Sequence, residues 1–282
     1  MKKAKNNFLE TNYIDNLHLP VSGFFRSDMH VHTTHSDGMS TAARILKKAR
    51  KLGIAFAITD HNTINGVIEA YKLKEKGDII IPGIELHSNE GPHFLFYFET
   101  LDELKEFYEN EVKPHKLSDI IYRTSLTIND IENLAQRTRN ATVSIAHPEA
   151  LLWANIENVI KKKKIKTDIF RKVHAAEIMC GQQSRMINKR SMLFAERHKL
   201  SVTGGSDAHS VVEFGTILTV AKAKDIKEFL EAIRKKESFV AGKEAAIHKK
   251  AIPRINMVRK MVNKQINHFP SYVRNKIRRN KK

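Results

Sequence analysis

The chain has 282 residues, of which 41% are hydrophobic and 28% charged, so it can bury a sizeable core and wholesale disorder is excluded. A single cysteine, Cys180, excludes an internal disulfide and a cysteine-rich zinc module, so any metal site must use histidine and carboxylate ligands. No apolar run approaches the roughly 18 residues that span a bilayer, and no signal-peptide core follows the first residues. We therefore expect a cytoplasmic protein.

Charge is the unusual feature of the composition. The formal net charge is +18, from 49 Lys and Arg against 31 Asp and Glu. Residues 245–282 hold twelve basic residues and no acidic ones, so subtracting these twelve charges leaves +6 for residues 1–244. The balance favours an anionic partner and predicts a moderately basic body followed by a strongly basic extension.

Short apolar strand candidates alternate with helical patterns from about residue 24 to residue 241. A strand over 24–32 is followed by a helix from about Ser40, its predicted cap, to Gly53, then by a strand over 54–59 and a helix over about 64–77. Further strands are expected over 79–81, 94–98, 141–146, 175–180, 200–203 and 239–240. This alternation predicts a parallel α/β sheet, and periodicity alone leaves open whether the sheet closes into a barrel.

Two segments depart from the alternation. Residues 101–140 mix helical and polar sequence, which predicts an inserted helical cap over one end of the sheet. In the basic extension, apolar residues at steps of three or four predict an amphipathic helix: Ile255, Val258, Val262, Ile266 and Phe269. The expected organisation is an N-terminal extension over 1–23, a main domain over 24–242 and a basic C-terminal helical tail over 243–282.

Histidines and carboxylates gather where the strand candidates end. His30 and His32 are two residues apart on the first strand, so both rings project from one face and can grip one metal ion. The others lie near the ends of strands: Asp37, Asp60, His61, Glu85, His93, His147, Asp207 and His209. Because the carboxyl ends of parallel strands converge at one end of a barrel, the pattern predicts a shared metal site. Taken singly, each residue also fits a turn, a helix cap or a surface ion pair.

These residues lie in motifs that resemble the polymerase and histidinol phosphatase (PHP) family of phosphoesterases. The motifs occur in the family's order over roughly residues 25–242: DMHVHT at 28–33 with SDG at 36–38, ITDHN at 58–62, GIE at 83–85, IAHP at 145–148 and GSDAH at 205–209. The resemblance implies a distorted seven-stranded (β/α) barrel, and therefore a closed sheet, with its phosphoesterase domain over 24–242.

The resemblance also implies a trinuclear metal site. It assigns the first ion to His30, His32, Glu85 and Asp207, the second to Glu85, His93 and His147, and the third to Asp37, His61 and His209. His35 is an alternative to Asp37. Imidazole and carboxylate ligands suit zinc, manganese and iron, and the sequence does not choose among them.

A metal-dependent phosphoric ester hydrolase is the expected activity, with a metal-activated hydroxide attacking phosphorus. Asp60 is expected to orient His61 or a proton, and His61 and Glu85 complete the catalytic set. Substrate contacts are expected from Arg123, Arg137, Arg139 and Arg185, because guanidinium groups match phosphate oxygens, and the resemblance adds Asn188. Glu177 and Asn188 fall where the family has polar residues, and the resemblance implies that they support the metal ligands or contact the substrate. Cys180 is expected to be a buried, inert thiol.

Three functions remain open. The leading one is hydrolysis of a phosphomonoester of a small metabolite or nucleotide. The alternatives are a 5′ to 3′ exonuclease or oligonucleotide-degrading enzyme, and a non-catalytic metal-binding scaffold recruited by its tail. The tail itself would pack on the barrel, bind an anionic membrane surface and make the enzyme peripheral, or contact RNA or DNA.

Overall fold

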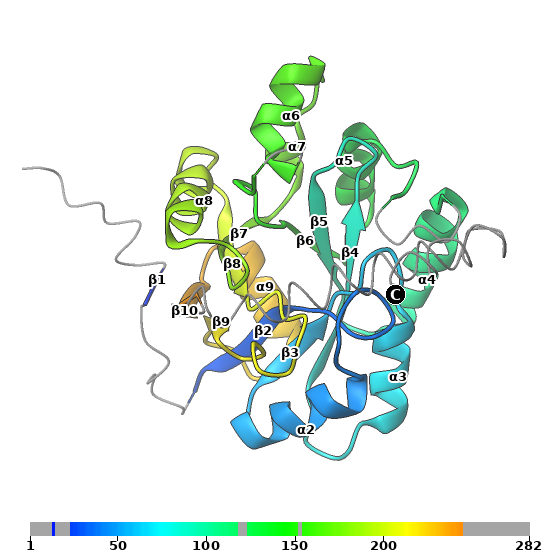
Figure 1. Cartoon of the computed structure of the whole chain (residues 1–282), viewed down its shortest axis with the longest axis vertical. Coiled ribbons are helices and arrows are strands. Elements are labelled where there is room, and N and C mark those ends of the chain that lie inside the picture. The colour runs from blue at the N-terminus through cyan, green and yellow to red at the C-terminus, as the bar shows by residue number, and fades with distance from the viewer. Residues whose placement is uncertain (1–12, 15–22, 118–122, 152–153, 245–282) are drawn as a thin grey trace, which may run out of the picture. The chain divides into compact units, whose positions relative to one another are not determined.

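The computed structural model describes residues 13–14, 23–117, 123–151 and 154–244 (Figure 1). The chain divides into two units, residues 1–245 and 246–282. The second unit lies outside the described residues, so the amphipathic tail helix, its partners and the boundaries of the three predicted segments stay predictions.

The described strands form one sheet of ten in the order β1-β10-β9-β2-β3-β4-β5-β6-β7-β8. They are β1 (Tyr13–Ile14), β2 (Phe25–Val31), β3 (Ala55–Ile58), β4 (Ile80–His87), β5 (His93–Tyr97), β6 (Thr142–Ile145), β7 (Ala175–Cys180), β8 (Ser201–Gly205), β9 (Ile217–Ala221) and β10 (Phe239–Gly242). The expected number of seven strands is therefore wrong. Strands β2 to β8 make up seven, and β9, β10 and β1 extend the sheet beyond β2.

The pairing directions set which strand ends meet. Strands β2, β3 and β4 are parallel, as are β6, β7 and β8, while β5 runs antiparallel to both β4 and β6. The carboxyl ends of these six parallel strands and the amino end of β5 therefore lie together. We call this the carboxyl end of the barrel.

The sheet curls until β8 returns beside β2, which makes it a nearly closed barrel. The residues that follow β8 bridge to the end of β2, where the His32 amide donates to the Ala208 carbonyl at 3.0 Å and the Ala208 amide to the His30 carbonyl at 3.3 Å. The Thr219 hydroxyl of β9 further links the two edges, lying 2.8 Å from both the amide nitrogen and the carbonyl oxygen of Gly204.

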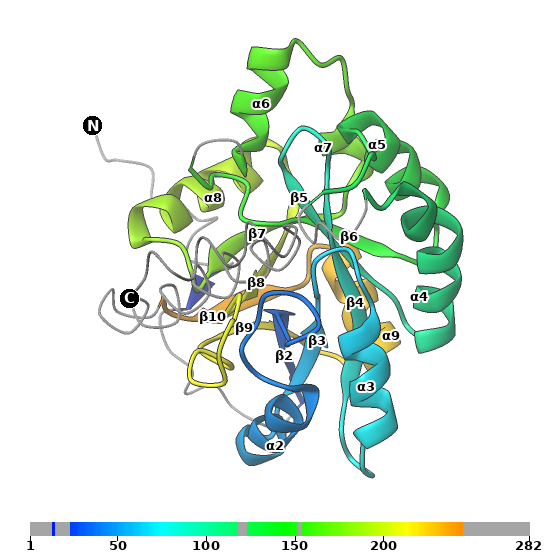
Figure 2. The same cartoon turned by 45° about the vertical axis from the view of Figure 1, so that its right-hand side comes forward.

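Helices surround most of the sheet (Figures 1 and 2). The described helices are α2 (Ala42–Leu52), α3 (Asn65–Leu73), α4 (Leu101–Phe107), a π-helical turn η1 (Tyr108–Val112), a 3-10 turn η2 (Lys113–His115), α5 (Ile128–Arg137), α6 (Ile156–Lys163), α7 (Ile169–Lys172), α8 (Arg185–Arg197) and α9 (Ile226–Arg234). Gly53 ends α2 in the left-handed conformation at φ 62°, as its position predicts. The N-cap is Thr41, not Ser40, because the Ser40 hydroxyl instead accepts the Val211 amide.

Two apolar layers hold the barrel together. Outward-facing strand residues pack beneath the surrounding helices, whereas an inner cluster fills the barrel with Met29, Leu95, Tyr97 and several alanines. Helix α9 adds Phe229, Leu230 and Ile233 to this inner cluster, and the Phe229 ring stacks on Phe25 at the start of β2 with centroids 4.5 Å apart. Helix α9 thus packs against the inner cluster near the amino end of β2.

The inserted segment is not a separate cap. Phe107 of α4 stacks on Phe96 of β5 with ring centroids 5.0 Å apart, so this helix belongs to the outer layer. Helix α5 buries Ile131 and Leu134 in the same outer cluster. Before α5, Thr124 reaches the carboxyl end, where its hydroxyl donates to the carbonyl of His87 at 2.6 Å. Within the described ranges, no helix is long and apolar enough to cross a membrane.

Candidate metal centre

The structure brings the nine predicted ligand residues together at the carboxyl end of the barrel. They fall into overlapping groups whose ligand atoms lie within 4.8 Å of one another: His32 with Asp37, His61 and His209, then His30 with His32 and Asp207, and Glu85 with His93 and His147. His93 joins them because β5 is antiparallel, so its first residue, not its last, meets the carboxyl ends of its neighbours.

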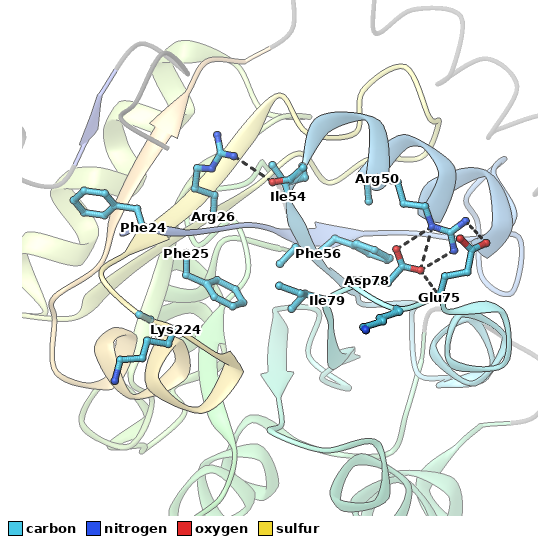
Figure 3. Close-up of a pocket in the computed structure, with 16 residues that line it drawn as sticks. Phe24, Phe25, Arg26, Arg50, Ile54, Phe56, Glu75, Asp78, Ile79 and Lys224 are labelled. Atoms are coloured by element: carbon cyan, nitrogen blue, oxygen red, sulfur yellow. Dashed lines mark hydrogen bonds and ion pairs between the residues drawn. The ribbon is translucent and has the colours of Figure 1, made fainter. Parts of the chain in front are cut away.

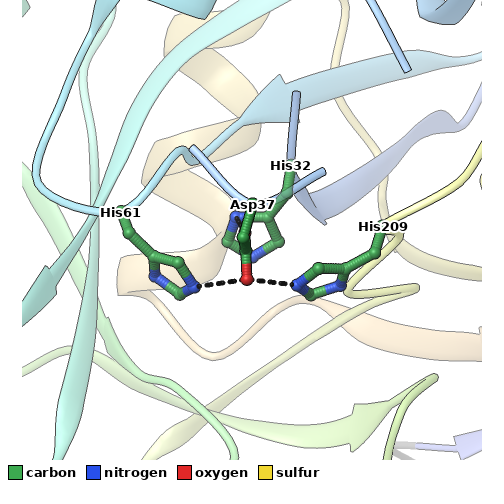
Figure 4. Close-up of side chains that lie close together, drawn as sticks. All are labelled: His32, Asp37, His61 and His209. Atoms are coloured by element: carbon green, nitrogen blue, oxygen red, sulfur yellow. Dashed lines mark hydrogen bonds and ion pairs between the residues drawn. The ribbon is translucent and has the colours of Figure 1, made fainter. Parts of the chain in front are cut away.

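Asp37 lies between two imidazole rings, as Figure 4 shows. Its Oδ2 is 2.9 Å from Nε2 of His209 and 3.5 Å from Nε2 of His61. The Nδ1 of His209 lies 2.9 Å from the carbonyl oxygen of Asp207, an acceptor, so that nitrogen carries a proton and Nε2 faces the group. His35 does not compete with Asp37, because its ring pairs with Glu69 at 2.7 Å.

Glu85 is the centre of the cluster. Its Oε1 lies 2.9 Å from Nδ1 of His93 and 3.3 Å from Nε2 of His147. Its Oε2 lies 2.8 Å from Nδ1 of His61, 3.2 Å from Nε2 of His30 and 3.4 Å from Nε2 of His32. One buried carboxylate therefore faces five rings, an arrangement suited to bridging two cations.

Backbone geometry at the site departs from ordinary strand ends. His147 and Asp207 have positive φ angles of 28° and 49°, in a region that non-glycine residues seldom adopt. Close packing at Gly205 brings β8 against β2, since a Cβ there would lie 2.5 Å from the backbone nitrogen of His30. Local strain and tight packing thus aim these ligand residues inward.

The donor set fits divalent cations. Several buried ring nitrogens and one carboxylate oxygen lack a hydrogen bond: His30 Nε2, His32 Nδ1 and Nε2, His147 Nδ1 and Glu85 Oε2. Leaving so many polar atoms unsatisfied in the interior is costly unless another group binds them. A cation shared by neutral imidazoles and carboxylates satisfies them together.

The electrostatics of these residues are strongly perturbed. Burial alone would raise the pKa of Glu85, but the rings of His61 and His30 hold that pKa well below its usual range. Burial lowers the pKa of His93 to about 4. For His209 burial also opposes the charged ring, yet the Asp37 carboxylate raises its pKa to about 9.

Metal binding is therefore expected to depend on pH. In the metal-free protein His209 carries a proton at neutral pH, and a metal ion requires the neutral ring, so binding must release that proton. The apparent zinc affinity should rise with pH, by about tenfold per unit for each proton released, and the contribution of His209 should level off near pH 9. Calorimetry in buffers of different ionisation enthalpy measures the release, and an affinity that is constant between pH 7 and 9 would contradict the expectation.

The contacts of Asp60 differ from the expected role of orienting His61. Its carboxylate accepts hydrogen bonds from the Thr33 amide at 2.7 Å, the Thr33 hydroxyl at 2.6 Å and the Ser36 hydroxyl at 2.6 Å. A Cβ on Gly66 would lie 2.0 Å from its Oδ2, so the carboxylate is held closely. Asp60 thus shapes the loop that carries Asp37, and none of these contacts involves the His61 ring.

The predicted substrate residues separate into two sets. Arg137 and Arg139 follow α5 and precede the amino end of β6, whereas His147 lies past its carboxyl end, and Arg137 pairs with Glu111. The structure therefore places both arginines at the wrong end for contact with the ligand cluster. Arg123 and Arg185 lie near the carboxyl end, beside Thr124 and at the start of α8.

Asn188 has a structural environment. It is buried, its Oδ1 accepts the Cys180 amide at 3.1 Å, and its Nδ2 donates to the Cys180 carbonyl at 3.2 Å. Both ends of the side-chain amide are thus committed to the backbone that follows β7. Cys180 is buried as expected, and burial raises the pKa of its thiol well above the usual range.

One histidine of the cluster is absent from the predicted set. His87, the last residue of β4, lies with its Nε2 2.7 Å from Nδ1 of His61 and stacks on the His93 ring with centroids 3.5 Å apart. Its position two residues after Glu85, on the same face of the strand, was the available signal.

A cleft of about 530 Å³ opens elsewhere, around the amino ends of β2, β3 and β4 (Figure 3). Its acidic side chains are already paired, since Arg50 binds Glu75 at 2.7 Å and Asp78 at 2.7 Å. None of the predicted ligands lines it. The cleft is therefore separate from the ligand cluster.

Comparisons with known proteins agree with the fold and the motifs. An uncharacterised protein of Methanocaldococcus jannaschii is 34% identical over 131 residues, which cover 38% of this chain and 77% of that one. A 5′-3′ exoribonuclease of Haemophilus influenzae is 38% identical over 64 residues, only 22% of this chain and 23% of the enzyme.

Among solved structures, the lesion-specific endonuclease Q of Pyrococcus furiosus is similar, with a TM-score of 0.61 at 20% identity. The match covers 77% of this chain and 57% of the endonuclease, so at this identity it shows a shared fold. The profile of the PHP domain matches residues 28–236, a span that holds all nine predicted ligands. The chain therefore belongs to the PHP domain family.

Proposed function

We propose that this protein is a metal-dependent phosphoesterase that hydrolyses a phosphomonoester of a small metabolite or nucleotide. One observation carries the proposal. The buried carboxylate of Glu85 lies within 3.4 Å of nitrogens from five histidines, and among the described residues buried ring nitrogens of His30, His32 and His147 have no hydrogen bond. Membership of the PHP family adds that such a cluster serves phosphoester chemistry.

Three ions of zinc, manganese or iron are the proposed cofactors. His30, His32, Glu85 and Asp207 would hold the first, Glu85, His93 and His147 the second, and Asp37, His61 and His209 the third. When bound, such ions acidify water and polarise a phosphoryl oxygen at neutral pH. His87 is a further donor beside His61 and Glu85.

The charge of the cluster favours phosphate. Three divalent ions would bring six positive charges against the carboxylates of Asp37, Glu85 and Asp207, leaving about +3. The hydrogen bond from Nδ1 of His209 to a backbone carbonyl directs Nε2 of that ring toward the site. Arg123 and Arg185, near the same end, are the proposed contacts to the remainder of the substrate.

A 5′ to 3′ exonuclease is the second candidate. The 64-residue similarity to an exoribonuclease and the fold shared with an endonuclease favour it over the metal-binding scaffold. Such an enzyme would use the basic surface, and in particular the tail, to hold RNA or DNA. The scaffold is least favoured, because a protein without catalysis would not need every ligand position filled.

A substrate screen tests these proposals. The full chain with added manganese or zinc is offered an aryl phosphate, phosphorylated metabolites, nucleotide bisphosphates and short oligonucleotides. We expect His30→Ala and Asp207→Ala each to abolish turnover, whereas Arg137→Ala, a change at the other end of the barrel, leaves it unaltered. Release of inorganic phosphate supports the phosphatase, and stepwise release of mononucleotides from the 5′ end supports the exonuclease. Equal turnover by wild type and both ligand variants would refute the metal centre.

A further inference from the structure

A second buried carboxylate lies behind the ligand cluster. Glu177 is on β7, is only 1% exposed, and lies two residues after Ala175, which belongs to the inner cluster of the barrel. The pairing of β7 with β8 shifts register between Glu177 and Met179, so the regular alternation ends directly after Glu177. The strand therefore turns this side chain inward, although none of the ligand groups includes it.

Both oxygens of Glu177 contact predicted ligand residues. Its Oε1 lies 3.0 Å from Nδ1 of the His30 ring, and its Oε2 accepts the backbone amide of His147 at 2.9 Å. The His147 residue has the positive φ of 28°, so this hydrogen bond stabilises a strained backbone. Glu177 thus joins two residues that the proposed centre assigns to different ions.

The contact with His30 determines which ring nitrogen faces the cluster. A carboxylate beside Nδ1 requires a proton on that nitrogen, which leaves the lone pair of the neutral ring on Nε2. That Nε2 is buried, has no hydrogen bond, and lies 3.2 Å from Glu85 and 3.5 Å from Asp207. The lone pair therefore points into the ligand cluster.

We propose that Glu177 is a positioning residue that holds His30 as the Nδ1–H tautomer and fixes the His147 backbone, so that both residues are preorganised for metal. This inference rests on the proposed metal centre. Glu177 would act through its contacts with two ligand residues, His30 and His147. Hydrogen bonding of this kind is worth about 10-fold to 100-fold in metal affinity.

The geometry explains why a carboxylate is required. Glu177 faces two donors, a ring N–H and a backbone N–H, and it has two oxygens to accept them. Glutamine has a single oxygen, and the His147 amide cannot become an acceptor. In Glu177→Gln the new NH₂ group would therefore face Nδ1 of His30, favouring the opposite tautomer. The Nε2–H of the His30 ring would then donate to Glu85 or Asp207. The ring nitrogen that should bind the metal would carry a proton, and the fold would stay unchanged.

The test is a zinc titration of the full chain by competition with a chelator. We expect Glu177→Gln to weaken the binding of at least one zinc ion by about 10-fold to 100-fold. The urea midpoint of the metal-free variant should equal that of wild type. The matched control is Glu213→Gln. Glu213 is also buried at the carboxyl end, but it accepts the amides of His209 and Ser210 and the Gln182 side chain, not a histidine ring. The zinc affinity of the Glu213→Gln protein should differ from that of wild type by less than about threefold, because no ligand ring loses its hydrogen-bond partner.

A second measurement does not depend on how the variants fold. In zinc-loaded wild type, the ¹⁵N resonances of the His30 ring should show a proton on Nδ1 and zinc on Nε2. Zinc on Nδ1, or wild-type zinc affinity in Glu177→Gln, would overturn the role of Glu177. Failure of the wild type itself to bind zinc or manganese would instead refute the proposed centre, so the two failures are distinguishable.

Discussion

Replacing Glu85 with glutamine is expected to reduce phosphoesterase turnover by at least about a thousandfold. Glutamine keeps the size of the side chain but offers one acceptor oxygen where the carboxylate offers two. In the structure both oxygens are used, since Oε1 faces His93 and His147 while Oε2 faces His30, His32 and His61. The variant would therefore lose the carboxylate that the proposed centre shares between its first and second ions.

Metal content measures this effect independently of activity. Elemental analysis of the purified variant should show fewer ions per chain than wild type. Glu69→Gln is the matched control, because Glu69 is a partly exposed carboxylate that pairs with the His35 ring and with none of the predicted ligands among the described residues. Normal metal content and turnover in Glu85→Gln would remove Glu85 from the centre of the site.

Two substitutions at Asp60 should behave very differently. Asp60→Ala leaves the buried Thr33 amide and two hydroxyls without their acceptor, which should cost about 3 kcal/mol of unfolding free energy and disorder the loop that carries Asp37. In Asp60→Asn, the amide oxygen can still accept from the Thr33 amide and the Ser36 hydroxyl. Its NH₂ can donate to the Thr33 hydroxyl oxygen, so we expect turnover to stay within about tenfold of wild type.

Urea unfolding of the metal-free proteins and turnover with manganese distinguish the two roles of Asp60. If Asp60 transferred a proton in the reaction, asparagine would abolish activity as fully as alanine does. A stable but inactive Asp60→Asn protein would therefore contradict the loop-shaping role and restore a catalytic one.

Much of the site is encoded by local sequence. The spacing of His30 and His32 places both rings on one face of β2, and Asp37-Gly38 follows in the turn after it. Apolar runs that end in His or a carboxylate located most strands to within a few residues, with 175–180 matching β7 throughout. These features depend on backbone periodicity and residue type, and both can be read from a short stretch of sequence.

Other features depend on contacts between distant segments. The structure showed that Arg137 and Arg139 lie at the other end of the barrel from the cluster, because α5 runs back toward the amino end of β6. It also showed that Asp60 is saturated by Thr33 and Ser36, residues more than twenty positions earlier. Hydrogen-bond saturation of this kind leaves no trace in the spacing of a motif.

The sequence by itself determined the family, the α/β class and the histidine and carboxylate residues that end the strands. It did not determine that β5 runs antiparallel, which is what carries His93 to the carboxyl end, nor that three additional strands extend the sheet beyond β2. Only the tertiary structure placed His87 against His61 and Glu177 behind His30 and His147. The physical reason is that strand direction and side-chain pairing are set by long-range packing and by the need to satisfy buried polar groups, not by local periodicity.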